Sequence, residues 1–472
     1  MNTNNQESFR DHIGTINEEG LRNWIHPKKP HGRFYTRRTI LSIILLTLFI
    51  IGPFIKVNGE QFMLFDILGR RFHIFGKPFF PQDFYLLALA AVIALIFLVL
   101  FTVVYGRIFC GWLCPQTIFM EMLFRKIEYF FEGDRPKQIK LDRMPWNAEK
   151  IRKRGLKWVV FYLVSLGITS VMLAYVAGSD YVINFWKHPF VDVKAWIIYL
   201  AFTTVFYFVF AWFREQVCII ACPYGRLQGV LTDENTIMVA YDYKRGEKRG
   251  PMRKGQDREA LGLGDCIDCK QCVLVCPTGI DIRNGTQLEC INCTACMDAC
   301  DATMDAIGKP RGLIRYASKV SIEEGHSKIF TPRVKFYTVV LVALLSAFIY
   351  LFANRPDVQL KVLRTRGQVF TELPNGKIQN MYQATIVNKS THAYKGLKIN
   401  LIDPKDGKVT VSGSNSGTGS GLNLKKEEIK QVIIFIDFPK NKFHGKHKIK
   451  LGIYDKNKLL DSYKTVFIAP VR

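Results

Sequence analysis

The chain has 472 residues, of which 49% are hydrophobic, and its formal net charge is +25. This length allows two or three domains, or one membrane bundle with attached domains. So much apolar content combined with so much positive charge is unusual for a soluble enzyme. The sequence contains no nucleic-acid-binding motif, so we do not expect a nucleic-acid partner.

Five apolar stretches follow a polar N-terminal tail, residues 1–38, which lacks periodicity. A helix that spans a bilayer needs roughly 20 mostly apolar residues, and each stretch is about that long. Only Lys335, at the start of the fifth stretch, is charged. The pattern predicts a five-helix transmembrane bundle rather than buried helices of a soluble protein. The stretches are 39–55, 84–106, 158–178, 195–213 and 335–353.

The Lys and Arg residues of the loops predict the orientation in the membrane. The tail carries seven and loop 115–156 carries ten, whereas loops 57–83 and 179–194 carry three and two. We therefore expect a cytoplasmic N-terminus and, after five crossings, a C-terminal segment on the opposite side. The first apolar stretch begins too late for an ordinary cleaved signal peptide, so we interpret it as a retained anchor.

The segment "MLFDILGRRFHIFGKPFFPQD", residues 63–83, is expected in an outward loop. Its alternating pattern indicates strands joined by a Gly-Arg turn. Met63 and His73 could contact copper in this loop, but simple packing at the surface is the preferred interpretation.

Two cysteine pairs follow the second and fourth apolar stretches, in "GRIFCGWLCPQTIF" and "REQVCIIACPYGRL". Both contain the pattern C-x3-C-P, which indicates an internal repeat of two membrane hairpins. Cysteines at i and i+4 share one side of a helix, so each pair could present two sulfurs in one direction. Thiolates favour soft metals such as Cu(I), and also zinc or iron–sulfur centres. The candidate metal-binding and catalytic residues are Cys110, Cys114, Cys218 and Cys222.

The alternative for these cysteines is that they are small packing residues, with Pro115 and Pro223 ending the helices. Arg107 and Arg214 precede the two pairs. They could stabilise thiolates, but the preferred interpretation is that they are snorkelling anchors at the helix ends.

Eight further cysteines lie in "CIDCKQCVLVCP" (266–277) and "CINCTACMDACD" (290–301). The spacing C-x2-C-x2-C-x3-C is that of bacterial two-cluster ferredoxins, in which the fourth cysteine binds the other cluster. We expect that cysteine to begin a helix. Asp301 stands where a ferredoxin usually has proline, and structural zinc is the alternative. The spacing predicts two [4Fe–4S] clusters, one bound by Cys266, Cys269, Cys272 and Cys300, the other by Cys290, Cys293, Cys296 and Cys276.

From about residue 357 the pattern changes to short alternating strands separated by turn signals. Roughly seven strands in this segment predict an immunoglobulin-like β-sandwich. It contains no cysteine and only the weak histidine motif "HGKH", His444 and His447. The predicted organisation is a tail (1–38), a four-helix membrane region (39–230), a ferredoxin module with connectors (231–333), a fifth membrane helix (334–354) and a β domain (355–472).

Taken in order, these motifs resemble the FixG/CcoG/RdxA-type cytochrome c oxidase accessory proteins, which are membrane polyferredoxins of bacteria with cbb3-type oxidases. The resemblance extends from about residue 35 onward and includes "LFDILGRRFHIFG", "RGLIRYAS", both C-x3-C-P motifs and both ferredoxin runs. It implies a multi-pass protein of the bacterial inner membrane, with the ferredoxin module in the cytoplasm and the β domain in the periplasm.

The resemblance also implies a function, reduction of Cu(II) to Cu(I) for the oxidase copper centre. Copper ions, oxidase assembly factors or copper chaperones, membrane lipid and an unidentified electron donor would be the partners. Two alternatives stay open, a quinol-linked electron-transfer subunit of a respiratory reductase and a redox-independent assembly scaffold.

Overall fold

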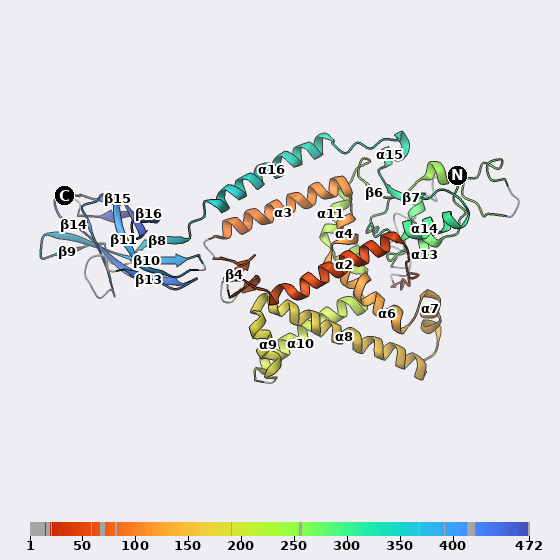
Figure 1. Cartoon of the computed structure of the whole chain (residues 1–472), viewed down its shortest axis with the longest axis horizontal. Coiled ribbons are helices and arrows are strands. Elements are labelled where there is room, and N and C mark those ends of the chain that lie inside the picture. The colour runs from red at the N-terminus through yellow and green to blue at the C-terminus, as the bar shows by residue number, and fades with distance from the viewer. Residues whose placement is uncertain are drawn as a thin grey trace. The chain divides into compact units, whose positions relative to one another are not determined.

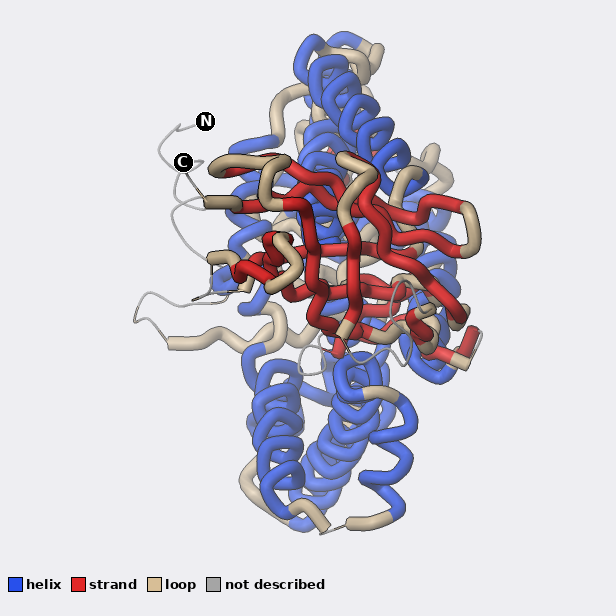
Figure 2. Tube along the Cα trace, turned by 90° about the vertical axis from the view of Figure 1, so that its left-hand side faces the viewer, coloured by secondary structure: helices blue, strands red, loops and turns tan. Residues whose placement is uncertain are grey.

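The computed structural model describes residues 15, 19, 21–57, 59–66, 71–80, 83–189, 191–253, 257–365, 367, 369–390, 392–412 and 421–470. They form two compact units (Figure 1). The helical unit comprises Met1–Gly52, Ala90–Ala174 and Asp180–Leu345, and the β unit comprises Pro53–Leu89, Tyr175–Ser179 and Ser346–Arg472. Figure 2 shows the strands of the β unit in red.

The five predicted membrane helices are all present. Four of them begin earlier than the predicted apolar stretches. In α2 and α8, where the difference is largest, charged residues that are good helix formers continue the helix beyond its apolar part. The helices are α2 (Arg33–Ile51, continued by a 3₁₀ turn to Phe54), α3 (Phe84–Tyr105), α8 (Ala148–Ala177), α10 (Val193–Phe208) and α16 (Pro332–Ala353).

The apolar side chains of these helices are largely uncovered by protein. In the most apolar part of each helix at most 28% of the residues are buried, and in α16 none is. Ile43 of α2 and Val339 of α16 are more than half exposed. Apolar surface of this extent is unfavourable in water, whereas a bilayer covers it without cost.

Short helices connect the membrane helices of the helical unit. An aromatic cluster that includes Phe119, Phe124, Phe161 and Phe210 forms its core. The connecting helices are α4 (Ile108–Trp112), α5 (Pro115–Thr117), the π-helical segment η3 (Ile118–Phe124), α6 (Arg125–Phe131), α7 (Arg135–Arg143), α9 (Ser179–Lys187), the π-helical segments η4 (Val209–Phe213) and η5 (Val217–Ala221), and α11 (Pro223–Leu231).

The cysteine-rich part of the helical unit follows α11. Strand β6 (Met238–Tyr241) pairs antiparallel with β7 (Ile314–Ala317), so the two ends of this module meet in one small sheet. Between the strands lie α12 (Tyr243–Gly246), α13 (Gln271–Leu274) and α14 (Ala295–Ala306), and α15 (Lys319–Glu324) follows β7. The segment before α2 also packs here, since the amide of Lys28 donates to the carbonyl of Leu274 at 2.8 Å.

The C-terminal part of the β unit is an immunoglobulin-like sandwich of two antiparallel sheets. The first has the order β12-β14-β10-β8, with β9 also paired to β10, and the second has the order β13-β11-β15-β16. The strands are β8 (Val358–Arg364), β9 (Thr371–Leu373), β10 (Lys377–Asn388), β11 (Tyr394–Asp403), β12 (Lys408–Val411), β13 (Leu422–Leu424), β14 (Ile429–Pro439), β15 (Lys446–Asp455) and β16 (Lys458–Ile468).

Alternating side chains of both sheets fill the sandwich core, as the period of two in these strands requires. Ile434, Ile436 and Phe438 of β14 are fully buried, whereas Ile433 is 44% exposed. The buried Tyr382 of β10 donates its hydroxyl to the carbonyl of Val466 in β16 at 2.9 Å, which ties one sheet to the other.

The predicted outward loop forms strands β1 (Lys56–Val57), β2 (Glu60–Gln61), β3 (Met63–Asp66), β4 (Arg71–Ile74) and β5 (Lys77–Phe79) of the β unit. Strands β3, β4 and β5 form one antiparallel sheet. The predicted Gly-Arg turn, within residues 67–70, lies outside the described residues.

Candidate metal centres

The two ferredoxin runs fold as matching loops, each followed by a helix. Asp268 and Lys270 of the first run have left-handed backbone angles, with φ of 55° and 56°, and Asn292 and Thr294 of the second have φ of 51° and 65°. These residues stand at equivalent positions between the cysteines. Non-glycine residues rarely adopt this conformation, and its occurrence at matched positions indicates a loop wound around a group.

Two cavities of about 340 Å³ each lie inside the module. The first is lined by Cys290, Cys293 and Cys296 together with Cys276 and Cys272 of the other run. The second is lined by Cys266, Cys269 and Cys272 together with Cys300. Each cavity thus receives cysteines from both runs, as crossed ligation in a two-cluster ferredoxin requires.

The arrangement of these thiols fits iron–sulfur clusters better than single zinc ions. A tetrahedral zinc site, with Zn–S bonds of about 2.3 Å, needs sulfurs about 3.8 Å apart. Among the residues that the structure describes, no three cysteine sulfurs lie within 4.8 Å of one another. Burial raises the pKa of Cys293 to about 11 and that of Cys290 to about 12. Both thiols must therefore lose a proton when they bind a metal centre as thiolates.

The fourth cysteine of each run does not begin a helix, which corrects the sequence prediction. Cys300 lies in the middle of α14, and Cys276 follows the short helix α13. The difference follows from the next residue. Pro277 cannot continue a helix, whereas Asp301 allows α14 to run to Ala306 and accepts hydrogen bonds from Arg33 and from the amide of Gly312.

The paired cysteines of the C-x3-C-P motifs do not share one helix face, contrary to the sequence prediction. Cys110 lies in α4 and Cys218 in η5, but Cys114 and Cys222 have extended backbones and cap the next helices, α5 and α11. The residue before a proline is disfavoured in the α conformation. Pro115 and Pro223 therefore begin new helices at the first position rather than ending old ones.

The structure brings two of these cysteines onto the second ferredoxin run. Cys110 and Cys218 pack against a buried cluster formed by Val275, Ile291, Cys293 and Ala295. Gly111 makes this approach possible, because a β-carbon at that position would overlap the carbonyl oxygens of Ile291 and Asn292. The amide group of Gln228 contacts the Cys110 sulfur at 3.4 Å.

The four C-x3-C-P thiols are close enough to influence one another electrostatically. Burial raises the pKa of Cys110 to about 11, and the neighbouring Cys114 and Cys222 add to the effect. Burial likewise raises the pKa of Cys218 to about 12. Without a metal these two thiols are protonated at neutral pH. Nevertheless, no three of the four sulfurs lie within 4.8 Å of one another.

Arg107 and Arg214 are not snorkelling anchors, because both are buried, 7% and 5% exposed. Arg107 donates to the carbonyls of Leu288 and Gly225, and so links the first cysteine pair to the ferredoxin module and to α11. Arg214 donates to both carboxylate oxygens of Glu128, at 3.1 and 2.7 Å.

Glu128 belongs to a buried network of charges that the sequence prediction missed. Burial opposes its ionisation, but Arg214, Lys157 and Arg125 outweigh that effect and lower the pKa of Glu128 to about 2. Arg125 in turn bonds Glu121 at 2.9 Å. The signal in the sequence was the presence of several charges within an otherwise apolar helical stretch, 118–131.

Of the histidines singled out in the sequence, only His73 is buried, with 2% of its surface exposed. It therefore does not simply pack at the surface. It pairs across the strands with Leu64, whereas Met63 pairs with Ile74 and so lies on the other face of the sheet. His447 Nε2 contacts the carbonyl of His444 at 2.9 Å on an exposed surface.

Comparison with known proteins places this site in a family. The family described as a 4Fe-4S dicluster domain matches residues 213–319, a 4Fe-4S binding domain matches residues 87–137, and the Ig-like fold at the C-terminus of FixG matches residues 348–470. The crystal structure of a FixG-related protein from Vibrio parahaemolyticus matches 24% of this chain and 98% of that chain, with 17% identity and a TM-score of 0.20.

Two curated relatives are similar over most of their length. Protein RdxA of Cereibacter sphaeroides is 39% identical over 388 residues, which cover 78% of this chain and 80% of RdxA. Nitrogen fixation protein FixG of Rhizobium meliloti is 30% identical over 458 residues, which cover 89% of this chain and 87% of FixG. Together with the five apolar helices and the cysteine-lined cavities, these similarities show that the chain belongs to the FixG/RdxA family and is a membrane iron–sulfur electron-transfer protein.

Proposed function

We propose that this protein reduces Cu(II) to Cu(I) for the maturation of a cbb3-type cytochrome c oxidase, and that copper binds at Cys110, Cys114, Cys218 and Cys222. The observation that carries the proposal is the packing of Cys110 and Cys218 against the buried cluster that contains Cys293 of the second ferredoxin run. This packing places a soft-ligand site beside the cluster of residues that includes a candidate cluster ligand.

We assign one [4Fe–4S] cluster to Cys266, Cys269, Cys272 and Cys300, and the other to Cys290, Cys293, Cys296 and Cys276. The composition of the two cavities supports this division, although Cys272 lines both. When bound, such clusters supply one-electron transfer at low potential. The protein holds them in apolar surroundings, with Ile280, Ile282 and Ile291 around the cavity of the second run.

The chemistry of the substrate agrees with the residues proposed for it. Reduction of Cu(II) takes one electron, and soft sulfur ligands stabilise the Cu(I) product. Cys110 and Cys218 must lose their protons when they bind metal. Because no three of the four sulfurs converge within 4.8 Å, we propose that Cu(I) is held by two thiolates at a time.

For the membrane arrangement we propose that the N-terminus and the ferredoxin module face the cytoplasm and that the C-terminal domain faces the periplasm of a bacterial inner membrane. The excess of Lys and Arg in the tail and in loop 115–156 supports this orientation. Oxidase assembly factors or copper chaperones would receive the Cu(I), and a donor of unknown identity would supply the electron.

The test is anaerobic Cu(II) reduction by the purified, chemically reduced protein, comparing wild type with Cys110→Ala/Cys222→Ala. Iron content and the EPR signals of the reduced protein serve as controls for intact clusters. The matched control variant is Leu113→Ala/Leu227→Ala, which changes exposed residues beside the same motifs. We expect the cysteine variant to keep its iron and lose Cu(I) formation, and the control to retain both.

Wild-type rates in the cysteine variant would contradict the copper assignment. A quinol-linked role predicts instead that quinol reduces the clusters while copper reduction is insensitive to these cysteines. A scaffold role predicts normal oxidase assembly when a cluster ligand is replaced and the protein is still present.

A further inference from the structure

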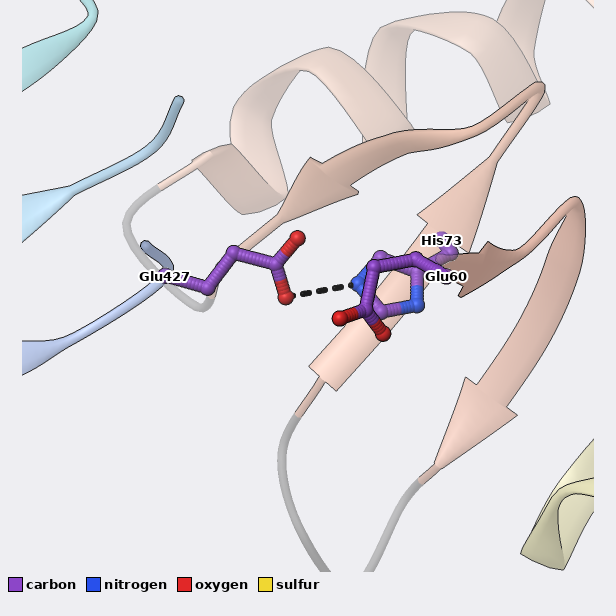
Figure 3. A group of neighbouring side chains, drawn as sticks. All are labelled: Glu60, His73 and Glu427. Atoms are coloured by element: carbon purple, nitrogen blue, oxygen red, sulfur yellow. Dashed lines mark hydrogen bonds and ion pairs between the residues drawn. The ribbon is translucent and has the colours of Figure 1, made fainter. Parts of the chain in front are cut away.

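The β unit contains a second group of potential metal ligands, formed by Glu60, His73 and Glu427. Glu60 comes from β2, His73 from β4, and Glu427 from the turn before β14, and Figure 3 shows their side chains converging. One ligand atom from each of the three lies within 4.8 Å of the other two. All three residues belong to the same compact unit.

Two members of the group are deeply buried. The side chains of His73 and Glu427 are 2% and 7% exposed, and His73 Nε2 lies 3.0 Å from Glu427 Oε2. Glu60 is more accessible, and one of its oxygens pairs with Lys426 at 2.6 Å with its side chain 27% exposed. The group therefore has a buried side formed by His73 and Glu427, and an open side at Glu60 through which a small ion could enter.

The buried pair leaves polar atoms unsatisfied. Among the described residues, neither His73 Nδ1 nor Glu427 Oε1 has a hydrogen-bond partner. Buried polar atoms are nearly always paired, so each exception calls for an explanation, and an ion that the structure does not contain is one. Glu427 also has a left-handed backbone, with φ of 56°, which aims its side chain from the turn toward His73.

The donor set selects the kind of ion. One imidazole and two carboxylates suit divalent transition metals, and affinity in such sites follows the Irving–Williams order, in which Cu(II) exceeds Zn(II). Metal–ligand bonds of about 2.0–2.2 Å place neighbouring ligand atoms about 3 Å apart, close to the separation of His73 Nε2 and Glu427 Oε2. No cysteine belongs to the β unit, so no thiolate there favours Cu(I).

We propose that Glu60, His73 and Glu427 bind a divalent transition-metal ion, and that Cu(II) binds more tightly than Zn(II). On binding, the metal replaces the proton between His73 and Glu427, and water completes its coordination. A role for this site in holding Cu(II) before its reduction rests on the proposed function, whereas metal binding does not.

The test uses the full-length protein with oxidised clusters and no reductant, so that copper reduction is not required. Cu(II) is added below one equivalent, and pulsed EPR records the modulation from the remote nitrogen of a coordinated imidazole. We compare wild type with His73→Gln and, as the matched control, with His447→Gln, which changes a partly exposed histidine of the same unit.

We expect His73→Gln to lose the imidazole modulation and to bind Cu(II) at least about tenfold more weakly, the lower end of the effect of changes around a metal site. The His447→Gln control should match wild type, and Zn(II) should displace Cu(II) only in excess. Wild-type protein without imidazole modulation, or His73→Gln with unchanged modulation, would overturn the proposal.

Because His73→Gln also breaks a buried contact, Glu60→Gln provides a second variant that leaves the pair of His73 and Glu427 intact. It should weaken Cu(II) binding. The unfolding temperature of the metal-free protein should change only slightly, because this variant loses only the ion pair with Lys426. If Glu60→Gln binds Cu(II) as wild type does, the three-residue site is wrong. If the reductase test fails while Cu(II) still binds at this site, the proposed function is wrong and the proposed metal site stands.

Discussion

The two units differ sharply in the metal ligands that they carry. All twelve cysteines lie in the helical unit, whereas the β unit contains none and instead brings together one imidazole and two carboxylates. Sulfur ligands favour soft ions such as Cu(I), and nitrogen with oxygen ligands favours Cu(II) or Zn(II). If both proposed sites bind copper, the comparison teaches that one chain can separate sites for two oxidation states of a metal by keeping its cysteines in only one of its units.

The helical unit and the sandwich core also differ in what they bury, although the β unit too contains buried ion pairs, of Asp83 with Arg355 and Lys389. The helical unit buries a network of charges around Glu128 and Arg214. The sandwich of the β unit is filled mainly by aliphatic and aromatic side chains, such as Ile434 and Phe438. Removing one member of a network of buried charges strongly lowers the free energy of unfolding. In an apolar core the loss of stability grows with the number of atoms deleted.

The largest effect is expected at the crossed cluster ligands of the helical unit. Cys276→Ser and Cys290→Ser lie in different runs, but both line the same cavity. If ligation is crossed, each variant loses the same cluster and about half of the iron. Iron analysis and EPR of the reduced proteins check this, with Asp305→Asn on α14 as the control. Different residual EPR signals in the two variants would show that the ligands are not shared in this way.

The next effect concerns the buried charges. Replacing Glu128 by Gln removes the carboxylate bonded to Arg214 and leaves it only the ion pair with Glu215 at 3.7 Å. The free energy of unfolding, measured by chemical denaturation in detergent, should fall by about 3–5 kcal/mol. Glu149→Gln, in an exposed helix pair with Lys153, should have little effect. Equal stability of the two variants would mean that the network does not stabilise the helical unit.

The same carboxylate predicts a pH dependence. Because the folded-state pKa of Glu128 is about 2, below the ordinary value of 4.5, its ionisation contributes stability at every pH above 4.5. That contribution falls as the pH decreases from 4.5 toward 2. In Glu128→Gln, stability should therefore depend less on pH in this window than in wild type. Acid unfolding monitored by circular dichroism measures the difference. An unchanged pH profile would contradict the assignment.

The smallest effect is expected in the sandwich. Tyr382→Phe removes the hydrogen bond to Val466 but keeps the ring, so the free energy of unfolding should fall by about 1 kcal/mol. The iron content should not change, since no cysteine is involved. Leu363→Ala, at an exposed position of the neighbouring strand, is the control. A change in iron content in Tyr382→Phe would show that the two units do not fold as separately as their compositions suggest.

Local patterns were enough to predict several features of the fold. The five membrane helices follow from apolar length, and strands such as β8 and β15 follow from alternation. The two ferredoxin runs follow from cysteine spacing, because the loop between neighbouring ligands is short and has few ways to fold.

Other features of the candidate sites were not predictable in this way. The local sequence predicts that Arg214 is an anchor at the membrane surface, because its partner, Glu128, is 86 residues away. The helix break within each C-x3-C-P motif does not follow from the spacing of four, which predicts one continuous helix, but from the proline after the second cysteine. That proline was the available signal.

The sequence by itself determined which segments are helices, which are strands, and which residues can bind soft metals, because these properties depend on near neighbours in the chain. Only the tertiary structure decided that Cys110 and Cys218 pack against the buried cluster that contains Cys293, and that His73 meets Glu427, which is 354 residues away. The physical reason is that such contacts depend on how whole elements pack, and packing joins surfaces irrespective of their separation along the chain.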